Sequence, residues 1–214
     1  NLGILRTVNG TLNLGGNVTA GQVGSIERIN GTVNLSGRID NIDSTLVLNA
    51  TTGSWNLKAG SLVGGTYSSS GGAGLVFTSS GGTFDGVIAN GDLDLATNNG
   101  ATAHVVNGLT LNGTARLGNA SGSNYGGLYF DGTETLGGTG TVVFGKSGSN
   151  FLDTYNTAYN NPSAVTLTIG PSVTIKGSAG NLSNGYYEAT IINQGTISAD
   201  DSGGLSSFAY DTNF

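Results

Sequence analysis

The hexapeptide Asn9-Gly10-Thr11-Leu12-Asn13-Leu14 returns 21 residues later as Asn30-Gly31-Thr32-Val33-Asn34-Leu35. The same pattern recurs as Asn90-Gly91-Asp92-Leu93-Asp94-Leu95. A contracted copy reads Asn107-Gly108-Leu109-Thr110-Leu111. A repeat of about 20 residues is typical of a solenoid, in which each copy forms one coil and stacks on its neighbours.

Each copy predicts a tight corner followed by a strand. Asparagine and glycine both tolerate positive φ angles, so the Asn-Gly pair turns the chain between two extended segments. In the first copy, Leu12 and Leu14 then point to one side of a strand while Thr11 and Asn13 point to the other, because side chains alternate along a strand. We therefore expect a buried face and a solvated face.

The composition extends this prediction to the whole chain. Of 214 residues, 39 are glycine and 9% are charged, and no segment spaces its apolar residues as a helix does. Hydrophobic residues make up 36% of the chain and recur as short runs, which favours an ordered structure over disorder. These runs, each expected to form a strand, are residues 46–48, 75–77, 87–88, 109–111, 128–130, 142–144, 165–169, 173–175 and 191–192.

The sequence therefore predicts an all-β fold, a right-handed parallel β-helix in which residues 1–214 form one elongated rod. The turn-strand repeat favours this solenoid over a β-sandwich, and the usual hand of parallel crossover connections predicts the right-handed coil. Coils of roughly 20 residues give about ten coils and a rod about 45 Å long. Open coil ends expose strand edges, so we expect self-association there.

Charge and cysteine content exclude several classes of function. The net charge is −6 and the seven Lys and Arg residues are scattered, so no basic stripe is available for nucleic acid. The absence of cysteine excludes disulfides and thiolate metal sites. We find no signal peptide and no long apolar segment, so we expect no membrane insertion and interpret the chain as a piece of a longer protein.

Three segments resemble the repeats of very large secreted bacterial β-helix proteins, of the adhesin, haemagglutinin-like and autotransporter passenger type. They are residues 107–115, residues 130–142 with Phe-Asp-Gly-Thr and Leu-Gly-Gly-Thr-Gly-Thr-Val, and residues 192–199 with Ile-Asn-Gln-Gly-Thr-Ile-Ser-Ala. The resemblance implies a secreted protein at the bacterial cell surface or in a matrix, with a structural, adhesive or filament-forming role. It carries over no catalytic residues, and we expect a non-catalytic module without a cofactor.

Tyrosine and phenylalanine side chains are the candidate partner-binding residues. The polar segment 145–163 is too long for a corner, and we expect it to protrude as a loop that carries Phe151, Tyr155 and Tyr159. These rings either hold a glycan or a cell-surface partner or, as their four-residue spacing favours, pack on the rod as a short helix or lid. Tyr186 and Tyr187 form a second aromatic pair at a turn.

Carboxylates raise the alternative of a polysaccharide-degrading β-helix, since lyases and glycosidases use clustered acids. Asp92 and Asp94 share one strand face and are the weak metal candidates, but a solvated surface is the preferred interpretation because no calcium-binding repeat is present. His104 has no second histidine with which to form a metal site. Ice or mineral binding is a minor alternative, because Thr-X-Thr occurs only locally, as in residues 166–168.

Overall fold

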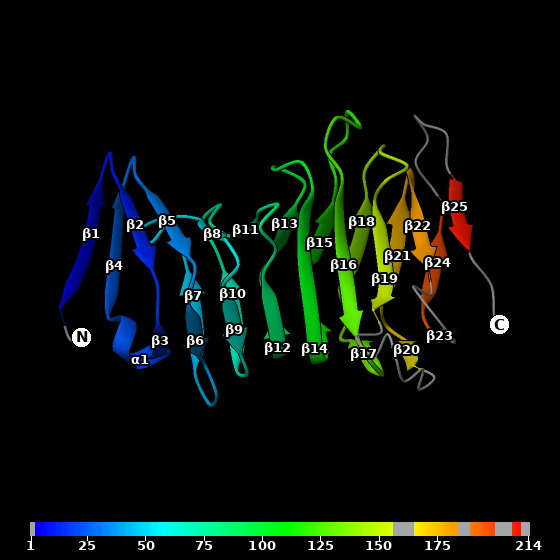
Figure 1. The fold of residues 1–214 in the computed structure, drawn as a ribbon, viewed down its shortest axis with the longest axis horizontal. Helices are drawn as coiled ribbons and strands as arrows, with labels where there is room; N and C mark the ends of the chain where they lie inside the picture. Colours follow the sequence, from blue (N-terminus) through cyan, green and yellow to red (C-terminus); the bar gives the residue numbers. More distant parts are fainter. Residues whose placement is uncertain (1–2, 156–164, 184–188, 200–206, 211–214) are drawn as a thin grey trace.

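The protein is an elongated rod of stacked coils (Figure 1). The computed structural model describes residues 3–155, 165–183, 189–199 and 207–210. It is 2% helical, and its parallel sheets form a β-solenoid of about 8 turns. The prediction of an all-β parallel β-helix is therefore confirmed.

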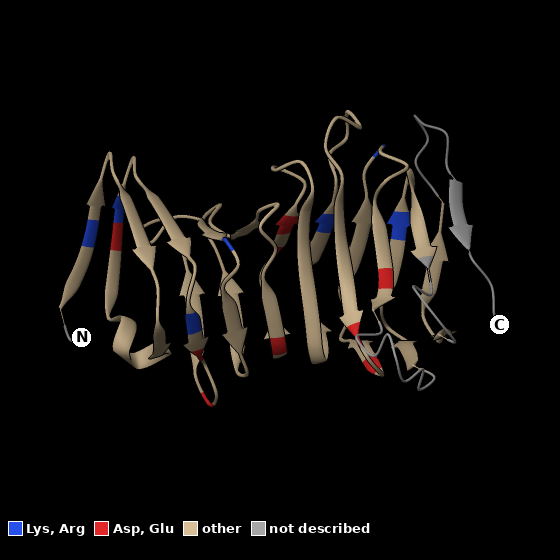
Figure 2. Cartoon of the chain, viewed as in Figure 1, with Lys and Arg blue, Asp and Glu red and all other residues tan. Residues whose placement is uncertain are grey.

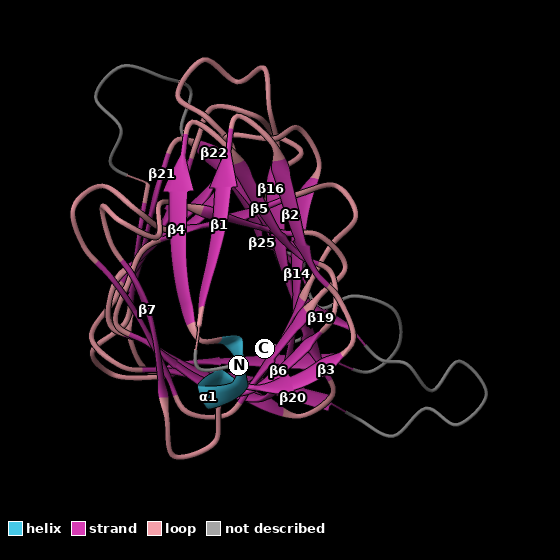
Figure 3. Ribbon diagram, turned by 90° about the vertical axis from the view of Figure 1, so that its left-hand side faces the viewer, coloured by secondary structure: helices cyan, strands magenta, loops and turns pink. Residues whose placement is uncertain are grey.

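The coils build three long faces around a central core, as the view along the rod shows (Figure 3). Face 1 is a continuous stack of one strand from each coil. Its strands are β2 (Thr11–Leu14), β5 (Thr32–Leu35), β8 (Trp55–Leu57), β11 (Leu75–Phe77), β13 (Leu93–Leu95), β15 (Thr114–Leu117), β18 (Thr141–Phe144), β21 (Thr174–Gly177) and β24 (Thr196–Ser198).

Faces 2 and 3 belong to one sheet, because two long strands bend around the corner between them. The strands of face 2 are β3 (Asn17–Thr19), β6 (Arg38–Asp40), β9 (Ser61–Val63), β12 (Thr83–Ala89), β14 (Ala101–Leu111), β16 (Gly126–Asp131), β19 (Phe151–Tyr155), β22 (Ala179–Ser183) and β25 (Ser207–Tyr210). Face 3 contains the second halves of β12 and β14 together with β7 (Thr45–Leu48), β10 (Thr66–Ser69), β17 (Glu134–Gly137), β20 (Val165–Ile169) and β23 (Ala189–Asn193).

The N-terminal end of the rod carries a short additional sheet and the helix. The sheet pairs β1 (Ile4–Val8) with β4 (Ser25–Ile29), and helix α1 (Ala20–Val23) lies between β3 and β4 along the chain. A capping box begins this helix, with Thr19 as the N-cap and Gln22 reaching back to the Thr19 backbone.

The strand register confirms the 21-residue repeat at the start of the rod, where Leu12 lies beside Val33 and Leu14 beside Leu35. The coils are longer further along. Val142 in β18 lies beside Ile175 in β21, 33 residues later. The prediction of about ten coils was wrong for this reason, since it assumed a constant coil length and the chain makes about 8 turns.

The Asn-Gly corners differ among the four copies. Asn9 and Asn30 have φ angles of 52° and 51°, as the prediction requires, but Asn90 is not among the residues with positive φ. The contracted copy was misassigned, because Asn107 and Gly108 bend β14 from face 2 to face 3 and do not begin a face 1 strand. The corresponding face 1 copy starts at Asn112, whose side chain donates to Asn90 Oδ1 at 2.8 Å.

Inward-pointing leucines, valines and aromatic residues form one continuous core along the rod. Leu35 is 1% exposed and Trp55 is 2% exposed. The equivalent leucines of the first coil, Leu12 and Leu14, are only partly buried, because no coil covers them on the N-terminal side in the described chain. The core is therefore complete inside the rod and open at this end.

Part of segment 145–163, which was predicted to protrude as a loop, is a strand. Residues 151–155 form β19 in face 2, and residues 156–163 lie outside the described residues. The physical reason is visible in the alternation of Phe151, Leu152, Asp153, Thr154 and Tyr155, in which Leu152 and Thr154 are fully buried. A turn, not a loop, precedes the strand.

Candidate functional site

Four aromatic rings lie together on the outer surface of face 2, and we call them the aromatic cluster: His104, Tyr129, Phe151 and Tyr155. Tyr129 is at the centre, with its ring centroid 5.0 Å from that of His104, 4.6 Å from Phe151 and 5.4 Å from Tyr155. His104 stacks on Tyr129 and meets Tyr155 edge-on at 5.7 Å. Tyr155 is 40% exposed, so the cluster is open to solvent.

Three adjacent strands bring these rings together from distant parts of the sequence. His104 in β14 lies beside Tyr129 in β16. Tyr129 in turn lies beside Asp153 in β19, and Phe151 and Tyr155 are two residues before and two residues after Asp153. All four side chains point outward, because their strand neighbours are the buried residues. Phe151 lies over Gly127, where a Cβ atom would overlap the phenyl ring. Glycine at position 127 thus lets the ring lie flat on the sheet.

Asp131 adds a polar partner at the edge of the cluster. Its two carboxylate oxygens lie 2.8 and 3.0 Å from His104 Nδ1. A carboxylate can only accept, so Nδ1 carries the hydrogen, and Nε2 of the neutral ring is then an acceptor. The His104 side chain is 33% exposed. The cluster therefore combines flat apolar surfaces with an oriented imidazole.

Glu134, the first residue of β17, lies next to the cluster and holds the bend in β14. Its carboxylate accepts the backbone N–H of Asn107 at 3.0 Å and that of Gly108. Burial raises the pKa of Glu134 above its ordinary value of 4.5, and the negative charges of Asp131 and Asp85 act in the same direction, while the two backbone hydrogen bonds lower it. The carboxylate is thus engaged in holding the turn.

This pKa shift predicts that Glu134 makes the stability depend on pH. The folded state holds the Glu134 proton more tightly than the unfolded state does. Its stabilising contribution is therefore complete below pH 4.5 and falls as the pH rises through the raised pKa. We expect the melting temperature of the wild type, relative to Glu134→Gln, to decrease between about pH 4 and pH 7. A difference that stayed constant or increased with pH would contradict this assignment.

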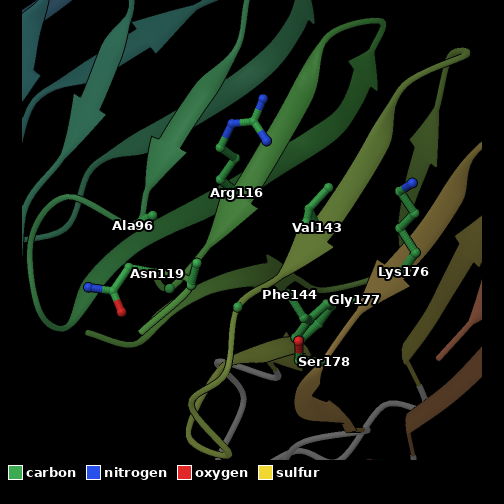
Figure 4. A pocket seen from close by; sticks show the side chains of 11 residues that line it. Ala96, Arg116, Asn119, Val143, Phe144, Lys176, Gly177 and Ser178 are labelled. Atoms are coloured by element: carbon green, nitrogen blue, oxygen red, sulfur yellow. The ribbon is translucent and has the colours of Figure 1, made fainter. Parts of the chain in front are cut away.

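A hollow lies on the outer surface of face 1, and we call it the cationic groove (Figure 4). Its volume is about 440 Å³. Arg116 in β15 and Lys176 in β21 stand on its two sides, and Val143 in β18 lies between them. Figure 2 shows the two cationic positions on β15 and β21, with the uncharged β18 between them.

Of the sequence-predicted binding residues, the structure brings two together and leaves three undescribed. Phe151 and Tyr155 are part of the aromatic cluster, but on a strand and not in the predicted helix or lid. Tyr159, Tyr186 and Tyr187 lie outside the described residues. Sequence reasoning missed Tyr129 and the role of His104, because only the register of three strands places them next to Phe151.

The weak metal candidates Asp92 and Asp94 are outward-facing on face 1 and hydrogen-bonded within the protein. Asp92 Oδ1 accepts the Thr114 backbone N–H at 2.8 Å. Asp94 Oδ1 accepts the backbone N–H groups of Ala96 and Thr97, each at 2.8 Å. Within the described ranges, no group of three or more His, Asp or Glu side chains is placed to hold a metal ion.

A column of threonines along face 1 was also missed by the sequence analysis. Register places one threonine on each of four successive strands, β15, β18, β21 and β24. The column is invisible in the sequence because the coils differ in length. Its members are Thr114, Thr141, Thr174 and Thr196.

Comparisons with protein-family models, curated proteins and solved structures found no match to this chain. Among the described residues, no helix has the length and apolar character that crossing a membrane requires. The site must therefore be interpreted from its own chemistry.

Proposed function

We propose that this chain is a non-catalytic β-helix module of a secreted bacterial surface, matrix or filament protein, and that the aromatic cluster attaches it to a glycan. The single observation that carries the proposal is the open group of four rings on face 2. A rigid parallel sheet supports these rings, so little conformational entropy is lost when a ligand binds.

The chemistry of the aromatic cluster suits a neutral sugar. Apolar C–H faces of a pyranose ring can pack on the exposed Tyr155, while sugar hydroxyl groups can donate to His104 Nε2. Asp131 keeps the imidazole in the orientation that presents this acceptor. The chain's net charge of −6 disfavours strongly anionic partners at a surface where no Lys or Arg belongs to the cluster.

Replacing Tyr155 by alanine tests this proposal. We expect wild type to be retained on part of a panel of immobilised neutral polysaccharides, and Tyr155→Ala to bind the same glycans about tenfold more weakly, because one stacking surface is lost. Affinity is measured by glycan array and then by titration calorimetry.

Tyr125→Ala is the matched control, because Tyr125 is 36% exposed, close to the 40% of Tyr155, and lies outside the cluster. This variant should bind like wild type. The proposal fails if wild type retains no glycan, or if Tyr155→Ala and wild type bind equally while both are folded by circular dichroism.

A polysaccharide-degrading enzyme is the second candidate, because Glu134 with its raised pKa lies near Asp131 and Asp85. Engagement of both Glu134 oxygens with the Asn107 and Gly108 backbone favours the non-catalytic role. A reducing-sugar and unsaturated-product assay over the same glycan panel separates the two, since turnover lost in Glu134→Gln would establish the enzyme.

A further inference from the structure

The cationic groove combines an apolar wall with two positive charges in a chain that has few of them. Only 7 of 214 residues are Lys or Arg, and two of these stand on opposite sides of one hollow. Arg116 lies beside Val143 in the register, and Val143 lies beside Lys176. Two strand spacings separate the cations, which places their backbones roughly 9 to 10 Å apart.

The hollow exists because side chains are missing at the corner next to these strands. Gly177 in β21 lies beside Phe144 in β18, which lies beside Leu117 in β15. Its φ angle is +129°, and a Cβ atom there would overlap the Phe144 backbone carbonyl. Alanine and valine side chains supply apolar surface to the remaining wall, which Phe144 also lines. A pocket of about 440 Å³ with a mainly apolar wall and a few polar groups is typical of small-ligand sites.

Neither Arg116 nor Lys176 is strongly neutralised by a carboxylate of the described chain. The nearest Arg116 nitrogen lies 3.6 Å from Asp92 Oδ2, and the two side chains are 54% and 57% exposed, so this ion pair is weak. For Lys176, no carboxylate of the described chain lies within ion-pair distance. A negative group bound between them would gain attraction from both sides at little loss to the existing pairs.

We propose that the cationic groove binds a small amphipathic carboxylate, in which an apolar ring rests on Val143 and the carboxylate pairs with Arg116 and Lys176. A planar carboxylate matches the guanidinium fork of Arg116. A strongly hydrated anion such as free phosphate or a uronic acid should bind less tightly than an amphipathic carboxylate. Its polar groups would lose water against the apolar wall, which is unfavourable. This site lies on face 1 and is independent of the aromatic cluster on face 2.

Titration with 2-naphthoate, followed by ligand fluorescence and calorimetry, tests the proposal. We expect saturable binding of one molecule per chain, weakened about tenfold or more in Arg116→Gln and in Lys176→Gln, because each loses a charge-assisted hydrogen bond. Lys58→Gln is the matched control, since Lys58 is exposed and does not line the groove. Val143→Asp should abolish binding by placing a negative charge in the groove, and melting curves confirm that each variant is folded.

The proposal is overturned if 2-naphthoate does not saturate the protein, if neutral 2-naphthalenemethanol binds equally well, or if glucuronate binds more tightly. Naphthalene-2-sulfonate distinguishes a carboxylate site from a general anion site, and binding tighter than that of 2-naphthoate also counts against the proposal. An acidic peptide that displaces 2-naphthoate with higher affinity would assign the groove to a protein partner instead. Tyr155→Ala should bind 2-naphthoate as wild type does. A failure of the carboxylate proposal can therefore be distinguished from a failure of the glycan proposal.

Discussion

Leu35→Asp is expected to remove most of the free energy of unfolding of the rod, whereas Leu14→Asp weakens it less and Asn13→Asp hardly at all. Leu35 is 1% exposed and lies between Leu14 of the preceding coil and Leu57 of the next. A carboxylate there has no partner and must be buried charged or take up a proton. Together with the lost apolar contacts, this costs at least about 4 kcal/mol, a large part of the 5 to 15 kcal/mol typical of domains.

The smaller effects follow from the open end of the rod. Leu14 is only partly buried, so an aspartate at that position stays partly hydrated. Asn13 is exposed, and its Oδ1 accepts a hydrogen bond from Asn34 at 2.8 Å, which a carboxylate oxygen can also accept. Urea unfolding followed by circular dichroism gives the three free energies. Equal values for Leu35→Asp and Asn13→Asp would mean that the inner and outer faces are assigned wrongly.

Asn150→Ala is expected to destabilise the rod by about 3 to 5 kcal/mol, because one buried side-chain amide forms hydrogen bonds with three backbone groups. The Asn150 side chain is fully buried. Its Oδ1 accepts the Gly126 N–H at 3.1 Å, and its Nδ2 donates to the carbonyls of Gly145 at 3.2 Å and Ala179 at 3.0 Å. These groups belong to successive coils, and alanine removes all three hydrogen bonds, although the Gly145 carbonyl still accepts the Ala179 backbone N–H at 3.1 Å.

The matched control for this prediction is Asn181→Ala. Asn181 Nδ2 donates to the Gly148 carbonyl at 3.0 Å at the surface, where water replaces the lost hydrogen bond. We expect its free energy of unfolding to fall by less than about 1 kcal/mol. Hydrogen exchange at the Gly126 amide should accelerate in Asn150→Ala and not in Asn181→Ala. Similar losses of stability in the two variants would show that the buried amide has no special role.

The class of fold follows from the amino-acid sequence alone, because the sequence signal for it is local. Alternation of Leu12 and Leu14 with polar residues, and the Asn-Gly corners at Asn9 and Asn30, are set by strand geometry and by backbone sterics within a few residues. The 21-residue offset between the first two copies also predicted their register. Phe151 and Tyr155 were recognisable as candidate binding residues from their type and spacing.

Which residues meet across coils depends on the tertiary structure. Coil length grows from 21 residues between Leu12 and Val33 to 33 between Val142 and Ile175, so constant spacing no longer identifies stacked positions. The meeting of His104, Tyr129 and Tyr155, and the approach of Arg116 and Lys176 across Val143, depend on this register. In a parallel stack, a side chain's neighbours lie one coil away, so a sequence with unequal coils predicts the strands but not their partners.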